Sequence, residues 1–291
     1  MRIAFIGFGE AARAYAASLR EVDPALDLSA HDIKQDGPEA DAFADAALAR
    51  GVTLAASSDE AVVGADVVIS AVTAASSLEA AQSVAHALPG GAVFMDINSV
   101  SPARKRETAA LIAGTGATYV DAAVMAPVHP AGHRTATLLA GALPESFLKT
   151  LTALDFRFEV AGEEVGSATA VKMLRSLFVK GLEALTVEAL TAARAAGCYP
   201  QVYGSLAKSF ASLGWPDFPS YQFERVMTHG LRRAAEMRES AATLSELGRP
   251  EASVLAQAIA SVHQSVGAAA LRAGKGEDPA QAADKLLAVR K

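Results

Sequence analysis

A lysine in the middle of the chain stands where it could transfer a proton. Lys172 follows the small residues of segment 166–171 and lies near the start of a long helical pattern. The positive end of a helix dipole disfavours an ammonium charge, and partial burial lowers a lysine pKa further. A lysine in that setting can exchange a proton near neutral pH, as the interconversion of an alcohol and a carbonyl requires. Spacing alone favours a plainer interpretation, a solvated lysine on an exposed helix face.

The same helical pattern places other polar side chains around Lys172. At about 100° per residue, Ser176 falls on the face of Lys172, and Arg175 and Lys180 flank it. Gly197 suits the position just after a helix end. The pattern therefore predicts a single helix of roughly thirty residues, which runs from one domain into a second.

The start of the chain has the pattern of a nucleotide-binding turn. Residues 2–6 have the composition of a strand, and a helical pattern begins directly after a short glycine turn. Strand, turn and helix in this order match the dinucleotide fingerprint with alanine in its third position. Such a turn lets the backbone approach a pyrophosphate, and the helix start offers N–H donors to it. The alternative is a βα turn that binds nothing. The expected cofactor-binding residues here are Gly7, Phe8, Gly9, Glu10 and Ala11.

Asp32 ends the second predicted strand, close to the spacing expected for an acid that binds the adenosine ribose. A carboxylate there repels a 2′-phosphate, which favours NAD over NADP, although Lys34 could offset that repulsion. The alternative is that Asp32 caps a turn or a helix. We therefore expect NAD as the cofactor, with NADP as the second candidate.

Strand and helix patterns alternate through the first half of the chain. Strands are expected at 26–32, 52–55, 66–72, 92–96, 118–123 and 137–140. Helix-length segments between them predict a parallel, doubly wound α/β sheet of the Rossmann type. Val72 and Thr73 stand at a strand end where ligands bind in such sheets, and we expect both to contact the cofactor. This domain is expected over 1–161, followed by an all-helical domain over 162–291 that begins with the long interdomain helix.

Composition limits the classes of function. The chain has 291 residues, 51% of them hydrophobic, and a net charge of −6. This suits two domains with sizeable cores, and it gives no indication of nucleic-acid binding. The single cysteine, Cys198, cannot form an intramolecular disulfide. No signal-type segment or membrane span is expected, so the sequence favours a soluble, cytoplasmic protein.

Four segments, in order, resemble the motifs of the β-hydroxyacid dehydrogenase family, which includes 3-hydroxyisobutyrate dehydrogenase, tartronate semialdehyde reductase and 6-phosphogluconate dehydrogenase. They are residues 5–9, 96–102, 121–127 and 166–172, and the resemblance covers the whole chain. It implies that Asn98 lies beside the nicotinamide and that Met125 and Ala126 belong to the substrate loop. It also implies that Lys172 is the catalytic acid/base.

Several residues depart from the family motifs. Met125 and Ala126 replace a serine and a glycine of the substrate loop, so the loop is bulkier and less polar here. Arg175 and Ser176 stand where the family has an asparagine. We therefore expect a small anionic substrate other than the family's ordinary hydroxyacids, with Met125, Ala126, Arg175, Ser176 and Lys180 as the substrate-binding residues. Arg175 could instead form an ion pair. These details resemble a divergent branch of the family with an atypical C-terminal domain.

The C-terminal half departs from the family at a cofactor contact. His229 begins the tripeptide that occupies the place of the family's Lys-Asp-Leu motif, and we expect it to contact cofactor or substrate. The alternative is a helix-face histidine without a special role. Ser220 is expected to cap this helix. No metal site is expected, because His129 and His133 have no neighbouring carboxylate and lie in a loop pattern.

The resemblance implies an NAD(P)-dependent oxidoreductase. A hydride would pass between nicotinamide and the carbinol carbon of a hydroxyacid-like or sugar-acid substrate, with Lys172 as general acid/base. One alternative is imine reduction on the same scaffold, which the retention of Lys172 disfavours. Another is a cofactor-binding sensor without turnover. Helical domains of this family mediate dimers, so we expect a homodimer through the C-terminal domain.

Overall fold

A computed structural model describes residues 1–290 of the chain. The chain divides into two compact units, Met1–Lys172 and Met173–Lys291. The division falls inside the long helix α7 (Ser167–Ala195), later in the chain than the boundary expected between residues 161 and 162. Lys172 is thus the last residue of the N-terminal unit.

The N-terminal unit is built on one eight-stranded sheet with the order β3-β2-β1-β4-β5-β6-β7-β8. Its strands are β1 (Arg2–Ile6), β2 (Asp27–His31), β3 (Thr53–Leu54), β4 (Val67–Ser70), β5 (Val93–Asp96), β6 (Thr118–Val124), β7 (Thr137–Gly141) and β8 (Phe158–Gly162). Neighbouring strands pair in parallel except β6 and β7. The strand order reverses its direction at β1 and β4, which is where such sheets bind ligands.

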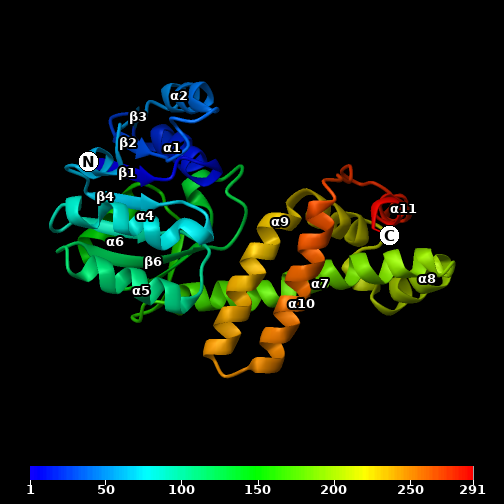
Figure 1. The fold of residues 1–291 in the computed structure, drawn as a ribbon. Coiled ribbons are helices and arrows are strands. Elements are labelled where there is room, and N and C mark those ends of the chain that lie inside the picture. The colour runs from blue at the N-terminus through cyan, green and yellow to red at the C-terminus, as the bar shows by residue number, and fades with distance from the viewer. Residues whose placement is uncertain (291) are drawn as a thin grey trace. The chain divides into compact units, whose positions relative to one another are not determined.

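Helices cover both faces of this sheet (Figure 1). They are α1 (Glu10–Val22), α2 (Ala40–Leu48), α3 (Ser58–Val62), α4 (Ser77–Val84), α5 (Pro102–Ala113) and α6 (Glu145–Ala153), with short 3-10 turns η1 (Ala74–Ser76) and η2 (Ala85–Ala87). Ile3 and Phe5 of β1 enter the core beside α1, α2 and α6, whereas Ala4 and Ile6 enter the core beside α3, α4 and α5. Successive residues of a strand point to opposite faces, so one strand serves both cores. The predicted doubly wound, Rossmann-type domain is confirmed.

One strand runs against the predicted direction. β7 pairs antiparallel with β6, and Val124 lies opposite Thr137. The connection 125–136 contains the 3-10 turn η3 (Gly132–Arg134) in place of a crossover helix, so the chain returns directly alongside β6. The helix α6 then leads to β8, which pairs in parallel with β7. The expectation of an entirely parallel sheet is therefore wrong at this pair.

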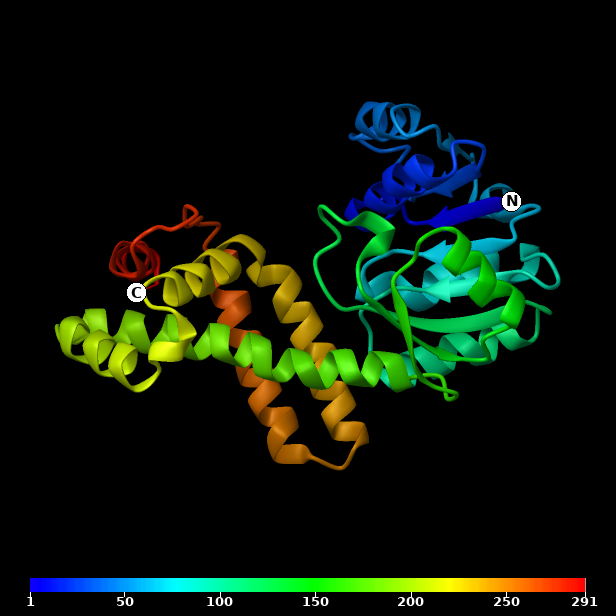
Figure 2. The ribbon, with the colours of Figure 1, turned by 180° about the vertical axis from the view of Figure 1, so that it is seen from behind.

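The C-terminal unit is helical, as predicted. Beyond α7 it contains α8 (Tyr199–Ser209), η4 (Ala211–Leu213), α9 (Asp217–Glu246), α10 (Pro250–Ala268) and α11 (Pro279–Val289). Figure 2 shows α9 and α10 side by side, connected by a short turn. Ser220 lies inside α9 and donates from Oγ to the carbonyl of Glu277 at 2.8 Å, so its predicted role as a cap is wrong. Over residues 1–290, we find no helix with the length and apolar character that a membrane span needs.

Candidate active site

The glycine turn between β1 and α1 is tight at Gly7 and open at Gly9. Gly7 has a φ of +87°, and a Cβ there would lie 2.6 Å from the carbonyl oxygen of Ala71. A side chain would therefore collide with the backbone after β4, and the turn needs glycine. A Cβ at Gly9 would meet nothing within 4 Å. Gly9 is the N-cap of α1 and provides no side-chain hydrogen bond, so the positive end of this helix suits an anion.

Asp32 lies directly beside this turn. Its Oδ2 accepts a hydrogen bond from the N–H of Phe8 at 2.8 Å, and its Oδ1 accepts one from the N–H of Lys34 at 2.9 Å. The carboxylate therefore caps its own turn, as the alternative interpretation holds. It also stands at the carboxyl end of β2, where a ribose-binding acid belongs. The two interpretations of Asp32 are compatible.

Asn98 connects the carboxyl ends of β4 and β5. Its Oδ1 accepts from the N–H of Val72 at 2.7 Å, and its Nδ2 donates to Oγ of Ser70 at 2.8 Å. Its own N–H donates to Oδ1 of Asp96 at 2.9 Å. Asn98 is buried, so these bonds fix the two loop starts relative to each other. The structure thus brings Val72, Thr73 and Asn98 together at the edge of the sheet that also holds the glycine turn.

Lys172 contacts the segment that follows β5. Its Nζ donates to Oγ of Ser99 at 2.6 Å, and the side chain is half-buried. Thr169, one turn earlier on α7, is buried and donates from Oγ1 to the carbonyl of Val100 at 3.0 Å. The segments that resemble the second and fourth family motifs therefore lie in contact, although they are far apart in sequence.

A buried lysine next to these segments was missed by the sequence analysis. Lys105 of α5 is fully buried, and its Nζ lies 3.1 Å from Oδ1 of Asp96 and 3.4 Å from Oδ1 of Asp121. Helical spacing could have found it, because Lys105 shares the buried face of α5 with Thr108 and Ile112. The sequence does not show that two carboxylates from β5 and β6 meet that face.

The predicted substrate loop follows β6. Met125 is half-buried and packs on the cluster of Ala123, Ala140 and Ala168, whereas Ala126 is exposed. The loop therefore extends directly from the strand beside the start of α7.

His133 anchors the far end of this loop. It is fully buried, its Nδ1 lies 2.7 Å from Oγ of Ser18, and its Nε2 lies 2.7 Å from the carbonyl of Leu154. Nε2 must donate to the carbonyl, so Nδ1 accepts from the serine. Burial lowers the pKa of His133, which keeps the imidazole neutral. Among residues 1–290, no group of three or more His, Cys, Asp or Glu side chains is placed to hold a metal ion.

In the C-terminal unit, two predicted substrate residues are bonded to each other. Lys180 and Ser176 are buried on α7, and Nζ of Lys180 donates to Oγ of Ser176 at 3.0 Å. The same Nζ forms an ion pair with Oε2 of Glu236 on α9 at 2.9 Å. The charge of Lys180 is thus balanced within the unit, whereas Arg175 is exposed to solvent.

A second buried ion pair, which sequence analysis also missed, lies one turn further along α7. Oε1 of Glu183 lies 2.8 Å from Nη1 of Arg233. Burial raises the pKa of Glu183, although Arg233 and Lys180 oppose the shift. These pairs join α7 to α9, so part of the polar face predicted around Lys172 is used for helix packing.

His229 lies on α9 and is half-buried. Burial lowers its pKa below the ordinary value, and the nearby guanidinium groups of Arg225 and Arg232 lower it further. The imidazole is therefore neutral at pH 7 and offers one donor and one acceptor, a suitable set for a polar ligand contact.

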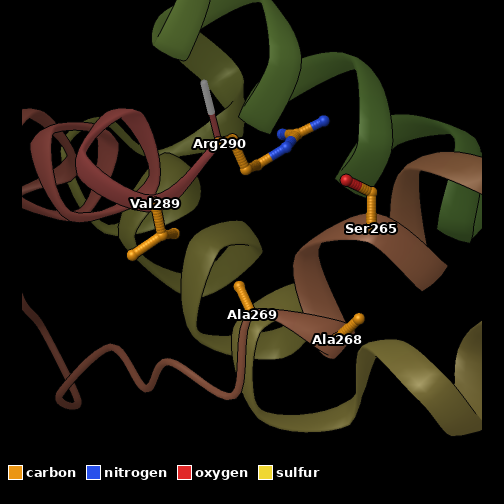
Figure 3. Close-up of a pocket in the computed structure, with 5 residues that line it drawn as sticks. All are labelled: Ser265, Ala268, Ala269, Val289 and Arg290. Carbon is orange, nitrogen blue, oxygen red and sulfur yellow. The ribbon is translucent and has the colours of Figure 1, made fainter.

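A pocket of about 580 Å³ opens in the C-terminal unit between the ends of α10 and α11 (Figure 3). Its lining residues are Ser265, Ala268, Ala269, Val289 and Arg290. Nη1 of Arg290 donates to Oε1 of Glu188 at 2.7 Å, so the one cation of the lining is already paired. The pocket contains none of the residues predicted to bind cofactor or substrate.

Comparison with known families assigns both parts of the chain. Residues 2–157, more than half of the chain, match the NAD binding domain of 6-phosphogluconate dehydrogenase. Residues 193–266 match a domain of unknown function, DUF1932. An uncharacterised 28.5 kDa protein of Methanothermus fervidus, from the 5′ region of 7S RNA, is 30% identical over 200 residues. That match covers 68% of this chain and 72% of the relative.

Two solved structures are similar over most of their length. A conserved hypothetical protein from Sinorhizobium meliloti 1021 is 35% identical with a TM-score of 0.76, over 98% of this chain and 95% of that chain. A conserved protein of unknown function, described as structurally similar to 3-hydroxyacid dehydrogenases, is 31% identical with a TM-score of 0.70. It covers 91% of this chain and 96% of its own. The chain therefore belongs to the family that carries the NAD binding domain of 6-phosphogluconate dehydrogenase, as the four ordered motifs predicted, in a divergent branch with a C-terminal domain of unknown function.

Proposed function

We propose that the protein is an NAD(P)-dependent oxidoreductase that acts on the CH–OH group of a hydroxyacid-like or sugar-acid substrate. The nicotinamide, when bound, supplies the hydride chemistry. Lys172 exchanges the proton of the substrate hydroxyl as general acid/base. The matched NAD binding domain supports the class of cofactor, and the position of Lys172 supports the class of reaction.

The contact between Lys172 and Ser99 carries this proposal. The ammonium lies 2.6 Å from a hydroxyl in the segment that resembles the nicotinamide-side motif. A proton-transfer group must lie within hydrogen-bond reach of the reacting hydroxyl, and the serine shows that Nζ can meet a hydroxyl here. A solvated lysine on an outer helix face, the plainer interpretation, would be more exposed than Lys172 is.

We propose NAD as the preferred cofactor and NADP as the alternative. The open space at Gly9 and the start of α1 suit the pyrophosphate, and in this proposal Asp32, which lies beside the turn, accepts hydrogen bonds from the ribose hydroxyls. Its negative charge opposes a 2′-phosphate. The proposed cofactor contacts are Gly7, Phe8, Gly9, Glu10, Ala11, Asp32, Val72, Thr73, Asn98 and His229.

We propose an anionic substrate, with Arg175 as its main charged contact. Arg175 follows Lys172 by three residues on α7, so the two side chains are neighbours on the helix surface, and it is exposed. Met125 and Ala126 form the other proposed contacts. Ser176 and Lys180 contribute indirectly in this proposal, because their bond to each other and the ion pair with Glu236 hold α7, which carries Arg175, against α9.

The test compares Lys172→Ala with Lys149→Ala. Lys149 is a matched control because it is exposed and pairs with Glu145 on its own helix. Thermal shift first selects the cofactor and a substrate from hydroxyacids and aldonates, because ligand binding raises apparent stability. Lys172→Ala should then lower kcat by about 10²- to 10⁴-fold, whereas Lys149→Ala should stay close to wild type.

Three results would overturn the proposal. A loss below about tenfold in Lys172→Ala is smaller than a general acid/base contributes and would remove the lysine from the mechanism. Reduction of cyclic imines without turnover of any hydroxyacid would assign imine reduction. Tight NAD binding without oxidation of any compound in the panel would assign a sensor.

We also propose that the protein is a cytoplasmic homodimer joined through its C-terminal unit. Leu174, Phe178 and Leu185 lie at helical spacing on α7 and are 42%, 70% and 68% exposed. An apolar stripe of this kind favours burial against another surface. Cys198 is a free thiol, which suits a reducing compartment. Light scattering should give twice the chain mass of 29.9 kDa, and Phe178→Glu should give the monomer. A wild-type monomer at micromolar concentration would contradict the dimer.

A further inference from the structure

Lys105 is held by more contacts than its charge alone requires. Besides its two carboxylate partners, its Nζ donates to the backbone carbonyl of Asp96 at 2.6 Å. Burying an ammonium and two carboxylates is unfavourable unless each is paired and hydrogen-bonded, and apolar side chains at all three positions would avoid that cost. The other hydrogen bonds of the two carboxylates indicate what the lysine does.

The first carboxylate, Asp96, connects Lys105 to the backbone just before Ser99. Oδ1 of Asp96 accepts from the N–H of Asn98, and Oδ2 accepts from the hydroxyl of Tyr119 at 2.8 Å. Burial and the nearby carboxylates raise the pKa of Tyr119 well above its usual value, so the phenol remains a donor. Lys105 therefore fixes a carboxylate that fixes the backbone turn immediately before Ser99.

The second carboxylate, Asp121, connects Lys105 to the start of α7, the helix that carries Lys172. Oδ2 of Asp121 accepts from the N–H groups of Gly166 and Thr169, each at 3.1 Å. These donors form the first turn of α7, where a carboxylate satisfies free N–H groups and is stabilised by the helix dipole. Oδ1 of Asp121 makes no hydrogen bond in the described chain, so its contact with Lys105 at 3.4 Å is purely ionic.

We propose that Lys105 is a positioning residue that holds both sides of the contact between Lys172 and Ser99. Through Asp96 it sets the backbone that presents the serine, and through Asp121 it sets the start of the helix that presents the lysine. The two paths form a closed ring in which the 2.6 Å contact between Lys172 and Ser99 is one link. The effect on catalysis rests on the proposed function, whereas the positioning is a property of the N-terminal unit itself.

Hydrogen exchange of the full chain without ligand tests the positioning directly. Lys105→Met removes the ammonium and retains an unbranched side chain, and Lys149→Met makes the same change on the surface of α6. Peptides covering 97–101 and 162–172 should exchange at least about tenfold faster in Lys105→Met, because local opening becomes easier where these contacts are lost. Lys149→Met should match the wild type. Unchanged exchange in both segments of Lys105→Met would overturn the inference.

A double variant separates positioning from simple charge neutralisation. Lys105→Met with Asp121→Asn contains one buried carboxylate fewer, and the new amide still offers an oxygen to the N–H groups at the start of α7. It also relieves the unpaired charge that could prevent Lys105→Met from folding. Positioning by the lysine predicts that exchange stays fast in both segments. Recovery of wild-type exchange would show that Lys105 only neutralises charge, and would overturn the inference.

Kinetics then connects the positioning to the reaction. Lys105→Met should lower kcat by about 10- to 100-fold and leave KM within about threefold, because a small misplacement of the reacting groups costs that much. The pH profile of kcat should also move, since the surroundings of Lys172 change. Faster exchange in the variant, with no turnover by the wild type, would refute the proposed function and support the positioning. Normal exchange and kcat in Lys105→Met, with Lys172→Ala inactive, would refute the positioning alone.

Discussion

Two glycines allow α9 and α10 to pack with their backbones in contact, so one added methyl group should destabilise the protein. A Cβ at Gly230 would lie 2.5 Å from the carbonyl oxygen of His263 and 2.8 Å from Cα of Gly267. A Cβ at Gly267 would lie 2.6 Å from the backbone nitrogen of Leu231. All of these neighbours are backbone atoms, which cannot rotate away as a side chain can. Gly230→Ala must therefore push the two helices apart.

The size of the effect follows from two opposing contributions. Overpacking a well-filled site costs about 1–3 kcal/mol, and contact with rigid backbone places Gly230→Ala near the upper end. Alanine in a helix interior regains about 0.5–1 kcal/mol relative to glycine, because the unfolded chain loses conformational freedom. We therefore expect the free energy of unfolding to fall by about 2 kcal/mol.

Urea unfolding followed by circular dichroism measures this change. Gly204→Ala in α8 is the matched control, because a Cβ there would meet nothing within 4 Å. The control should gain about 0.5–1 kcal/mol from helix propensity alone. The same substitution should thus have opposite signs at two helical sites of one unit. If Gly230→Ala stabilised the protein as Gly204→Ala does, the close contact between α9 and α10 would be refuted.

Three further predictions concern the cofactor and pH. Gly9→Val should weaken NAD binding at least about tenfold in calorimetry, because the valine side chain would fill the open space at the turn. An unchanged Kd would contradict the proposed phosphate contact. Asp32→Asn should lower the ratio of the NADP Kd to the NAD Kd by about tenfold, since the charge that repels a 2′-phosphate is removed; a constant ratio would exclude that role. Burial lowers the pKa of His263 from 6.5 to about 4, so the unfolded chain takes up the proton first and acid destabilises the fold. The free energy of unfolding should fall by about 3 kcal/mol between pH 6.5 and 4 through this residue. In His263→Gln, the free energy of unfolding, measured by urea titrations at each pH, should fall less steeply as the pH is lowered.

Features that depend on local backbone chemistry could be predicted from the sequence. The turn at Gly7 needs a positive φ and close approach to the next strand, and only glycine provides both, so the fingerprint identified it. The direction of β7 could not be predicted in this way. An apolar run specifies a strand but not its direction, which depends on whether the preceding connection crosses over the sheet.

Ion pairs between residues far apart in the sequence could not be predicted either. Lys105 stands between two arginines, and the helical period alone indicates which of the three faces the core. Its partners Asp96 and Asp121 come from separate strands, and local spacing carries no information about their convergence. The same holds for Lys180, whose partner Glu236 lies on another helix. Spacing predicted the shared face of α7 and could not show that α9 covers part of it.

Two of the residues that depart from the family motifs differ in their surroundings from two that match them. Asp121 is buried and caps α7, and Lys172 is held at the edge of the sheet. Among the departures, Ala126 and Arg175 are exposed and Met125 is half-buried, whereas Ser176 is buried and bonded to Lys180. A change at an exposed position alters what the surface binds and costs little stability, whereas breaking a buried ion pair costs about 3–5 kcal/mol. The divergence at Ala126 and Arg175 therefore falls where it can change recognition, and we expect the proposed proton-transfer group to act on a substrate that the family's ordinary members do not bind.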